Sequence, residues 1–289
     1  MYQIDLLSIK DHLVEIALEA GKRIKETSGT VEFIDKKNGV DLVTKIDKEI
    51  EVFVSAALKE RYPEFEFCGE ESYVSGTQLT DGPVFIVDPI DGTTNFIHFF
   101  PNCCISLGFA YQKEPLVGVI YSPFLNVLYT GAKGHGSYVT MGQNLPLKLP
   151  LLNPSPLKLQ SALCAIEWGS DRCGKNFKVK SDTFKLLAAE EKDGGAFVHG
   201  FRSTGSAALN LASVAAGSLD CYWEGGIQVW DVCAGWIILE EAGGKIVGGN
   251  PGEWETPVDS RIYLAIRGGE HQDEFISEFW KHIRGKLDY

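Results

Sequence analysis

A short acidic segment, residues 88–95 (Asp-Pro-Ile-Asp-Gly-Thr-Thr-Asn), most constrains how this chain can fold. It directly follows the apolar, β-branched run 84–87, which is typical of a buried strand. The chain therefore leaves a sheet straight into two carboxylates, Asp88 and Asp91, and then into a glycine and two hydroxyls. Carboxylates at the end of a strand suit hard cations, and the Gly-Thr-Thr backbone offers N–H groups to an anion. A cation site and an anion site on one turn are what metal-dependent phosphoryl transfer requires.

Taken alone, the segment has an alternative interpretation as an ordinary strand-to-loop turn with solvated aspartates. Other acidic positions favour the first interpretation. The strand-like run 65–68 leads into Gly69-Glu70-Glu71-Ser72, a second junction of the same kind. Asp231 stands before a nearly all-apolar helix, where an N-cap is its simplest role. Because a strand ending in Glu224-Gly225-Gly226 precedes it, we expect Asp231 to point into the same interior cleft.

Two helix starts carry further candidates. Asp47 lies near Thr44 at the start of a predicted helix, where we expect it to hold a metal-bound water through a hydrogen bond. Capping or turn chemistry is the alternative role for Asp47. Gly205-Ser206-Ala207 opens a helix of small residues whose N–H groups would let a substrate approach closely, although tight helix packing explains this pattern equally well.

Composition and charge exclude several classes of partner. The chain has 289 residues, of which 44% are hydrophobic and 23% charged, as in an ordinary globular protein. Its net charge of −12 argues against a nucleic-acid partner, although bound cations can reverse the local sign for a small phosphate ester. No apolar run reaches the roughly 18 residues of a membrane span, and the first residues do not resemble a secretory signal. We therefore expect a cytoplasmic protein with no nucleic-acid or membrane partner.

Other reactive residues lack the spacing of known chemistry. The seven cysteines include no C-x-x-C pair, which argues against a disulfide framework or zinc site and fits buried free thiols in a reducing compartment. The six histidines show no metal-binding spacing. No G-x-S-x-G elbow, Walker loop or G-x-G-x-x-G after a strand occurs, so acyl-enzyme, nucleoside triphosphate and dinucleotide chemistry lack support.

Hydrophobic periodicity predicts helices packed on sheets. Helices are expected at 5–27, 47–58, 182–191, 205–217, 232–242 and 272–283, and strands at 84–87, 104–111, 115–122, 126–132, 161–166, 220–223 and 262–265, with a hairpin or loop at 31–43. The strands from 84 to 132 should form an antiparallel meander. Four of the twelve prolines lie in 142–158, which marks an internal boundary. We predict a single domain over 1–289, with an N-terminal α+β half (about 1–150) and a C-terminal α/β half (about 151–289).

The motifs resemble those of the inositol monophosphatase family, and most closely those of its fungal members. Three segments carry the match in the family's order and spacing: Gly69-Glu70-Glu71-Ser72, Asp88-Pro89-Ile90-Asp91-Gly92-Thr93-Thr94-Asn95-Phe96 and Trp230-Asp231-Val232-Cys233-Ala234-Gly235. The first segment and Lys36 favour the inositol branch of the superfamily. The resemblance implies a layered α-β-α-β-α sandwich of the inositol monophosphatase and fructose bisphosphatase type, a homodimer, dependence on Mg²⁺ and inhibition by Li⁺.

The resemblance also implies a role for each site residue. Glu70 would orient the nucleophilic water, while Thr93 and Asp47 would share its proton. The backbone of Gly92 and Thr93 would hold the phosphate, and Lys36 would sit in a mobile loop that closes the site. The implied metal ligands are Glu70, Asp88, the Ile90 carbonyl, Asp91 and Asp231. The implied substrate contacts are Glu70, Ile90, Asp91, Gly92, Thr93, Ser170, Gly205, Ser206, Ala207, Glu224 and Asp231.

The implied activity is hydrolysis of inositol monophosphate to inositol and phosphate by in-line attack of a metal-activated water, in inositol metabolism and phosphatidylinositol signalling. One alternative is a phosphatase of the same superfamily acting on 3′-phosphoadenosine phosphate or a bisphosphorylated sugar, for which Glu167-Trp168-Gly169 would lie near a base pocket. Another is a metal- and phosphate-binding protein without catalysis, against which the complete ligand set argues. Gln228 stands where animal members of the family often have His, so the match does not carry lithium affinity or a third metal.

Overall fold

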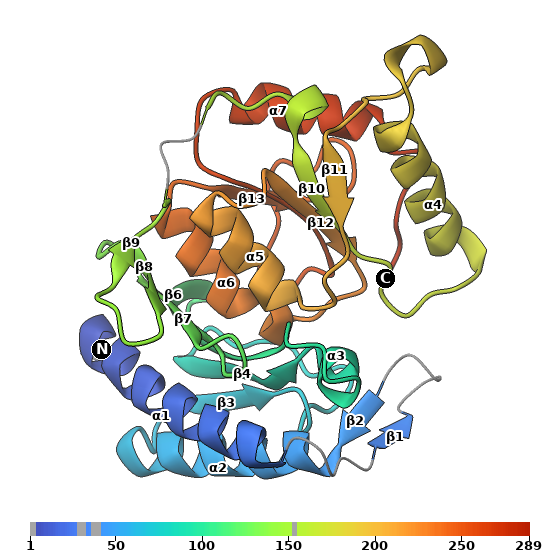
Figure 1. The fold of residues 1–289 in the computed structure, drawn as a ribbon. Coiled ribbons are helices and arrows are strands. Elements are labelled where there is room, and N and C mark those ends of the chain that lie inside the picture. Colours follow the sequence, from blue (N-terminus) through green and yellow to red (C-terminus); the bar gives the residue numbers. More distant parts are fainter. Residues whose placement is uncertain (1–3, 28–32, 36–41, 152–154) are drawn as a thin grey trace.

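The chain folds into five layers in the order helix, sheet, helix, sheet, helix (Figure 1). The computed structural model describes residues 4–27, 33–35, 42–151 and 155–289. The layered α-β-α-β-α sandwich expected from the sequence is confirmed. Three apolar clusters separate the layers, one on each outer side of the two sheets and one between them.

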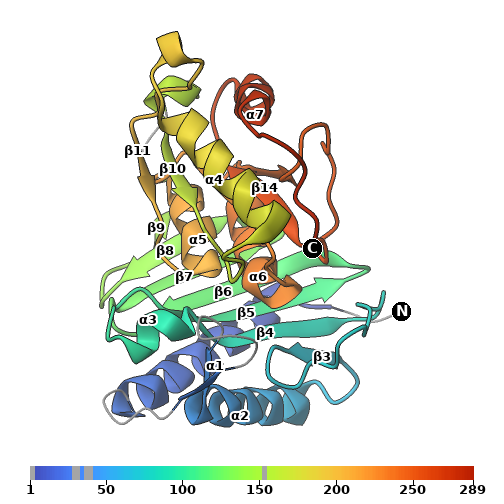
Figure 2. The same cartoon turned by 90° about the vertical axis from the view of Figure 1, so that its right-hand side faces the viewer.

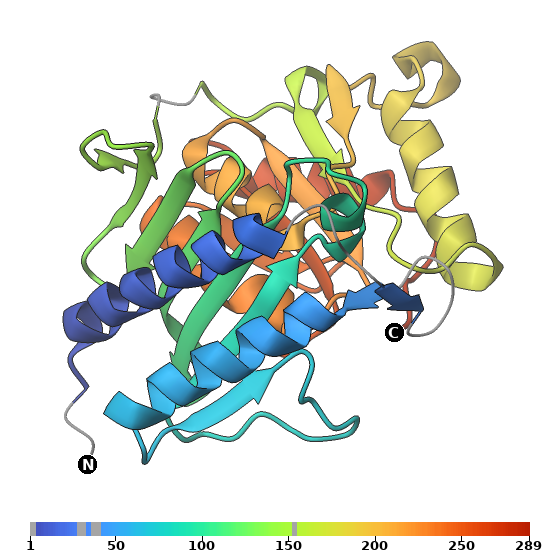
Figure 3. The same ribbon diagram turned by 60° about the horizontal axis from the view of Figure 1, so that its bottom comes forward.

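The first layer consists of α1 (Leu6–Thr27) and α2 (Lys45–Arg61), which run across one face of the larger sheet (Figure 3). Both are amphipathic, as the spacing of their apolar residues predicts. Between these helices in the sequence, β1 (Phe33–Asp35) and β2 (Leu42–Thr44) pair antiparallel. The expected hairpin is therefore confirmed in its described part. Lys36, expected in a mobile loop, lies outside the described residues.

The larger sheet has seven strands in sequence order. They are β3 (Glu66–Gly69), β4 (Val84–Asp91), β5 (Cys104–Tyr111), β6 (Glu114–Ser122), β7 (Val127–Ala132), β8 (Ser137–Met141) and β9 (Leu147–Lys148). The expected antiparallel meander is confirmed, and only β3 and β4 pair in parallel. The short helix α3 (Thr93–Ile97) follows β4.

The middle layer holds α5 (Ala207–Ala216) and α6 (Val229–Glu241), which lie between the two sheets (Figure 2). A helix covered on both sides must be apolar all round, which explains why nearly every residue of these two is buried. Close approach to the larger sheet is possible because glycines lie opposite α6. A Cβ on Gly118 would overlap the Ala234 carbonyl oxygen and lie 2.8 Å from Cγ2 of Ile237.

The smaller sheet and the last helix layer complete the fold. The strand order is β11-β10-β12-β14-β13, with β10 parallel to both neighbours. The strands are β10 (Leu163–Ile166), β11 (Gly200–Arg202), β12 (Cys221–Gly225), β13 (Lys245–Gly248) and β14 (Ile262–Ile266). The outer face carries α4 (Gly174–Ala188) and α7 (Gln272–Lys281), and short 3₁₀ turns occur at Leu159–Ser161 and Glu191–Asp193.

The helix boundary that differs most from the sequence prediction is the start of α4. The helix expected at 182–191 begins eight residues earlier, at Gly174, and ends at Ala188. Its first half was hidden because a buried lysine, Lys180, occupies a position on the inner face where an apolar residue is the usual signal. Within the described residues, no helix is long and apolar enough to cross a membrane.

The glycine at the contact between β6 and α6 provides a test of the packing. We expect Gly118→Ala to lower the free energy of unfolding by about 1–3 kcal/mol, because the added methyl group overlaps helix backbone that cannot move away. Gly82→Ala is the matched control, since its Cβ would meet only side-chain ends, Glu66 Oε1 at 3.0 Å and Thr80 Oγ1 at 3.3 Å, and no backbone atom within 3.7 Å. Urea denaturation measures both, and an equal loss in the two variants would contradict this account.

Candidate active site

The site begins at the end of β4, where the chain places two aspartates close together. In a regular strand, residues three apart point to opposite faces, so Asp88 and Asp91 would diverge. The pairing of β4 with β5 changes register between Asp88 and Asp91, and this irregularity breaks the alternation. The N–H of Ile90 donates to Asp88 Oδ1 at 3.0 Å and holds the first carboxylate inside the turn.

A third aspartate comes from α6 in the middle layer. Asp231 lies in the first turn of α6, where its Oδ2 accepts a hydrogen bond from the Gln228 N–H at 2.6 Å. The sequence pattern alone suggested that Asp231 caps this helix. In the structure Gln228 is the N-cap, and Asp231 is the third residue of the helix. One carboxylate oxygen from each of Asp88, Asp91 and Asp231 lies within 4.8 Å of the other two.

The N-terminus of α5 holds Asp91. The Ser206 hydroxyl donates to Asp91 Oδ2 at 2.6 Å, the Ala208 N–H donates to the same oxygen at 2.7 Å, and the Ala207 N–H lies 3.3 Å from Oδ1. The positive end of the helix dipole therefore faces this carboxylate. The resemblance implied Ser206 and Ala207 as substrate contacts, and in the structure both also bind Asp91.

The buried carboxylates raise one another's pKa. Burial is the largest cause for Asp88, and the negative charges of Glu70, Asp91 and Asp231 raise its pKa further, well above the ordinary value. Burial also raises the pKa of Asp231 well above its ordinary value, with the charges of Asp91 and Glu70 adding to it. The pKa of Asp91 rises to about 6, because burial outweighs the hydrogen bonds from Ser206 and the start of α5. A cluster of buried oxygen donors with excess negative charge fits a hard divalent cation.

Next to the aspartates lies a hydroxyl paired with a buried carboxylate. The Thr93 Oγ1 is 3.1 Å from Asp47 Oδ1 and 3.1 Å from the Ile90 carbonyl oxygen. Asp47 is fully buried in the first turn of α2. Gly92 precedes Thr93 with a φ of +92°, and a Cβ there would lie 3.1 Å from two carbonyl oxygens, so only glycine suits this turn. The structure thus joins Asp47 and Thr93, 46 residues apart in the sequence.

Glu70 enters the site from the end of β3. Its backbone N–H donates to the Val87 carbonyl at 3.1 Å, and its side chain lies close enough to Asp88 to raise the pKa of that residue. The next residue is held by Glu51 of α2, whose Oε2 accepts the Glu71 N–H at 2.7 Å. Glu51 is buried, and the sequence analysis missed it because its partner lies 20 residues away in a different element.

A second group of polar residues lies at the ends of β10 and β12. Glu224 is buried, its carboxylate accepts a hydrogen bond from the Tyr222 hydroxyl, and burial raises its pKa to about 8. Ser170 follows Gly169, where a Cβ would lie 3.8 Å from Glu224 Oε1. Glu167 accepts the backbone N–H groups of Thr204 and Gly205 at 2.6 Å and 2.9 Å.

The sequence did not indicate the roles of Glu167, Asn210 and Asn95: Glu167 was expected only near a base pocket, and Asn95 only as the last residue of the acidic motif. The Asn210 side chain donates to Glu167 Oε1 at 2.9 Å, and the Asn95 side chain donates to the Thr204 carbonyl at 2.7 Å. Together they fix the turn before α5. No local pattern reveals these roles, because the Glu167–Asn210 and Asn95–Thr204 bonds join residues far apart in the sequence.

The geometry defines a class of protein before any relative is considered. Buried carboxylates from β4 and α6 meet a helix N-terminus, a glycine turn and a threonine–aspartate pair at the junction of two sheets. This combination suits divalent-cation chemistry on a phosphate group.

Comparison with known proteins gives the family. The model of the inositol monophosphatase family matches residues 5–284. Inositol monophosphatase 2 of Saccharomyces cerevisiae is 52% identical over 278 residues, which cover 93% of this chain and 92% of the relative. The structure of inositol monophosphatase from Anabaena (Nostoc) sp. PCC 7120 is 30% identical with a TM-score of 0.78 and covers 97% of this chain and 98% of that one.

A Staphylococcus aureus IMPase-II has been solved with two different ligands. The complex with inositol monophosphate is 29% identical with a TM-score of 0.72 and covers 94% of this chain and 92% of that one. The complex with 2′AMP is 29% identical with a TM-score of 0.74 and covers 95% of each chain. The chain belongs to the inositol monophosphatase family, whose members are metal-dependent phosphatases that hydrolyse phosphate monoesters.

The raised pKa values predict how pH and divalent cations affect stability. The folded-state pKa of Asp91, about 6, is above its ordinary value of 3.8, so its contribution to stability is complete below the lower value and lost as pH rises through the higher. With EDTA present, we expect the midpoint temperature of thermal unfolding to be lower at about pH 7.5 than at about pH 5. Added Mg²⁺ should raise the midpoint more at the higher pH, because the deprotonated carboxylates bind it.

The control for this prediction is Asp91→Asn, which removes the titration of Asp91 and one candidate ligand. The cation-dependent increase in the midpoint should disappear in this variant at both pH values. An equal effect of Mg²⁺ on the unmodified chain at both pH values would contradict the assignment of these carboxylates as cation ligands.

Proposed function

We propose that this chain hydrolyses inositol monophosphate to inositol and inorganic phosphate with the help of Mg²⁺. The observation that carries the proposal is the convergence of Asp88, Asp91 and Asp231 within 4.8 Å beside the Thr93–Asp47 hydrogen bond. The family membership supports the reaction class, and the staphylococcal relative bound to inositol monophosphate supports the substrate. A 2′AMP complex of the same relative makes a nucleotide monoester the alternative to test.

The donor set is suited to Mg²⁺. We assign the ligands to Glu70, Asp88, the Ile90 carbonyl, Asp91 and Asp231, which offer oxygen atoms alone, as Mg²⁺ prefers. When bound, the cations would activate water as a nucleophile and neutralise charge on the phosphoryl and leaving-group oxygens. The hydrogen bonds from Ile90, Ala208 and Gln228 keep the carboxylates oriented for this purpose.

The proton of the attacking water passes to groups of the chain itself. We propose that Glu70 and Thr93 orient the water, and that Thr93 relays its proton to Asp47. The Thr93 hydroxyl is placed for this because Asp47 Oδ1 lies 3.1 Å away in a fully buried position. A buried carboxylate held at hydrogen-bond distance is a suitable general base for such a relay.

The substrate would lie across the junction of the two sheets. The backbone N–H groups of Gly92 and Thr93 are proposed to hold the phosphate, since the first N–H groups of a helix have no partner within it. The polyol hydroxyls are assigned to Ser170, Gly205 and Glu224, with Ser206 and Ala207 acting through Asp91 at the same edge.

Three properties extend the proposal. We propose inhibition by Li⁺ and a homodimeric assembly, both on the resemblance to the family. We also propose a place in cytoplasmic inositol metabolism and phosphatidylinositol signalling. The seven cysteines are all free thiols, and five of them are buried, which supports a reducing compartment.

The first test is phosphate release from myo-inositol 1-phosphate. We expect release only with Mg²⁺ and suppression of it by Li⁺, with inositol as the second product. Adenosine 2′-phosphate, 3′-phosphoadenosine phosphate and fructose 1,6-bisphosphate serve as comparison substrates. Preference for one of these over inositol 1-phosphate would keep the chemistry and overturn the substrate, and no release from any would overturn the enzymatic assignment.

The second test removes one carboxylate from the centre. Asp91→Asn should abolish turnover while leaving the far-ultraviolet circular dichroism unchanged, because metal-assisted monoester hydrolysis depends on each ligand. Asp11→Asn on the exposed face of α1 is the matched control and should retain full activity. More than roughly a tenth of the unmodified activity in Asp91→Asn, a barrier change of only about 1.4 kcal/mol, would contradict the ligand assignment.

A further inference from the structure

A buried lysine contacts the two segments that carry Glu224 and Ser170, and we call these two segments the wall. Lys180 is on α4 and is fully buried, on the same helix face as Thr183 and Leu187. Its Nζ donates to the Gly225 carbonyl at 2.8 Å and to the Trp168 carbonyl at 3.1 Å. A buried ammonium group is costly unless polar partners compensate it, so this lysine is not explained by core packing alone.

The two carbonyls belong to the segments that carry the proposed polyol contacts. Gly225 follows Glu224 at the end of β12, and Trp168 comes two residues before Ser170 in the loop after β10. Gly169 lies between them with a φ of +61°, and a Cβ there would be 3.1 Å from Lys180 Nζ. Lys180 therefore joins two segments more than fifty residues apart, at the point where both reach the substrate side.

An aromatic ring from the end of the chain covers this junction. The ring centroid of Tyr289 lies 5.2 Å from Lys180 Nζ and 5.8 Å from the Arg261 guanidinium carbon. A Cβ on Gly226 would lie 2.8 Å from the ring, which shows how closely the ring rests on the backbone after Glu224. Figure 1 shows the chain end beside α4 and the end of β12.

The segment that carries Tyr289 is fixed to the body of the protein. Asn250 accepts the Leu287 N–H at 2.8 Å and donates to its carbonyl at 3.3 Å. Asn176 on α4 does the same for Asp288, at 3.0 Å and 2.8 Å. Both backbone groups of these two residues are thus occupied, which holds the ring in place over Lys180.

We propose that Lys180, covered by the Tyr289 ring, is a positioning residue that holds Ser170 and Glu224 for the substrate polyol and so sets selectivity for polyol phosphates over simple phosphate esters. The inference rests on the proposed function, since it assumes that Ser170 and Glu224 contact the substrate hydroxyls. It assigns no direct contact with the phosphate or the metal ligands to Lys180. Its positive charge also lies near Glu224 and counteracts the effect of burial on that carboxyl.

The test compares two substrates in one protein. Inositol 1-phosphate has hydroxyls that the wall can bind, whereas p-nitrophenyl phosphate has none. A displaced wall should therefore weaken binding of the first substrate more than binding of the second. We expect Lys180→Met to raise KM for inositol 1-phosphate about tenfold while kcat falls less than about threefold, because lost positioning weakens binding of the polyol. The loss in kcat/KM for p-nitrophenyl phosphate should be smaller, by a factor of about five or more.

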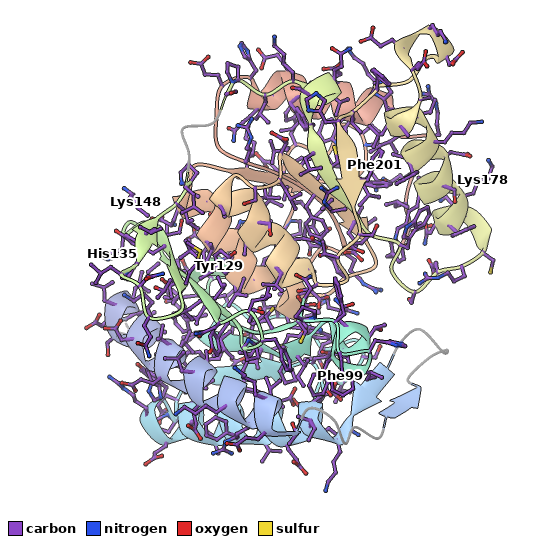
Figure 4. The ribbon with its side chains drawn as sticks, in the orientation of Figure 1. Phe99, Tyr129, His135, Lys148, Lys178 and Phe201 are labelled. Atoms are coloured by element: carbon purple, nitrogen blue, oxygen red, sulfur yellow. The ribbon has the colours of Figure 1, made fainter. Side chains whose placement is uncertain are left out.

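Lys178→Met is the matched control. Lys178 lies on the same helix, its side chain is 75% exposed, and it pairs only with Asp182 one turn away among the ion pairs of the described chain. Figure 4 shows its side chain pointing away from the protein. Its kinetic constants for both substrates should equal those of the unmodified protein.

Tyr289 supplies a second test that leaves the Lys180 side chain in place. Tyr289→Leu should reproduce the selective rise in KM. Tyr289→Phe keeps the ring, so its KM should equal that of the unmodified protein. If Lys180→Met does not fold, as judged by circular dichroism, this pair decides the outcome. Equal losses on both substrates, or no loss in Tyr289→Leu, would overturn the inference. Failure of the unmodified protein to hydrolyse inositol 1-phosphate would overturn the proposed function instead.

Discussion

The negative charge of three clustered aspartates is the constraint on which the site depends. Asp88 and Asp91 are buried and Asp231 is partly buried, and one carboxylate oxygen of each lies within 4.8 Å of the other two. Each carboxylate accepts backbone N–H groups from a different place: the end of β4, the start of α5 and the residue before α6. Folding therefore concentrates negative charge that only protons or a cation can balance. Burial of apolar side chains on either side of the cluster offsets the free energy needed to hold these carboxylates together. The stability of the site therefore depends on the core around it.

The layers pack closely enough for the starts of α5 and α6 to reach the end of β4. Glycines on three neighbouring strands, Gly108, Gly118 and Gly131, lie against α6 at Cys233, Ala234 and Ile238. Side chains at these positions would push the helix away from the sheet and carry Asp231 with it. Small residues along α5 allow the same close approach beneath the smaller sheet. Backbone proximity, set by glycine and alanine, thus determines the separation of the carboxylates.

Local sequence was sufficient to predict most helices, the antiparallel meander and the acidic turn, because strand alternation, helix periodicity and the 88–95 motif are encoded by neighbours. The order of the five layers was predicted from the resemblance to the family. What remained hidden depends on distant partners. Glu51 and Glu167 act on backbone N–H groups in other elements, and nothing in their own surroundings indicates it. The start of α4 was missed because Lys180 occupies a core position, an exception that only its partners at Trp168 and Gly225 explain.

The two sides of the site are built by different means, and this bears on how substrate choice can change. The side that faces the phosphate consists of a turn, helix starts and carboxylates that any monoester hydrolysis would require. The proposed polyol side carries Ser170 and Glu224 on two segments that Lys180 joins through the Trp168 and Gly225 carbonyls, beside the Tyr289 ring. On this proposal, substitutions around Lys180 would alter which alcohol is accepted without altering the chemistry at phosphorus. Separation of this kind suits a fold in which one hydrolytic centre serves several phosphate esters.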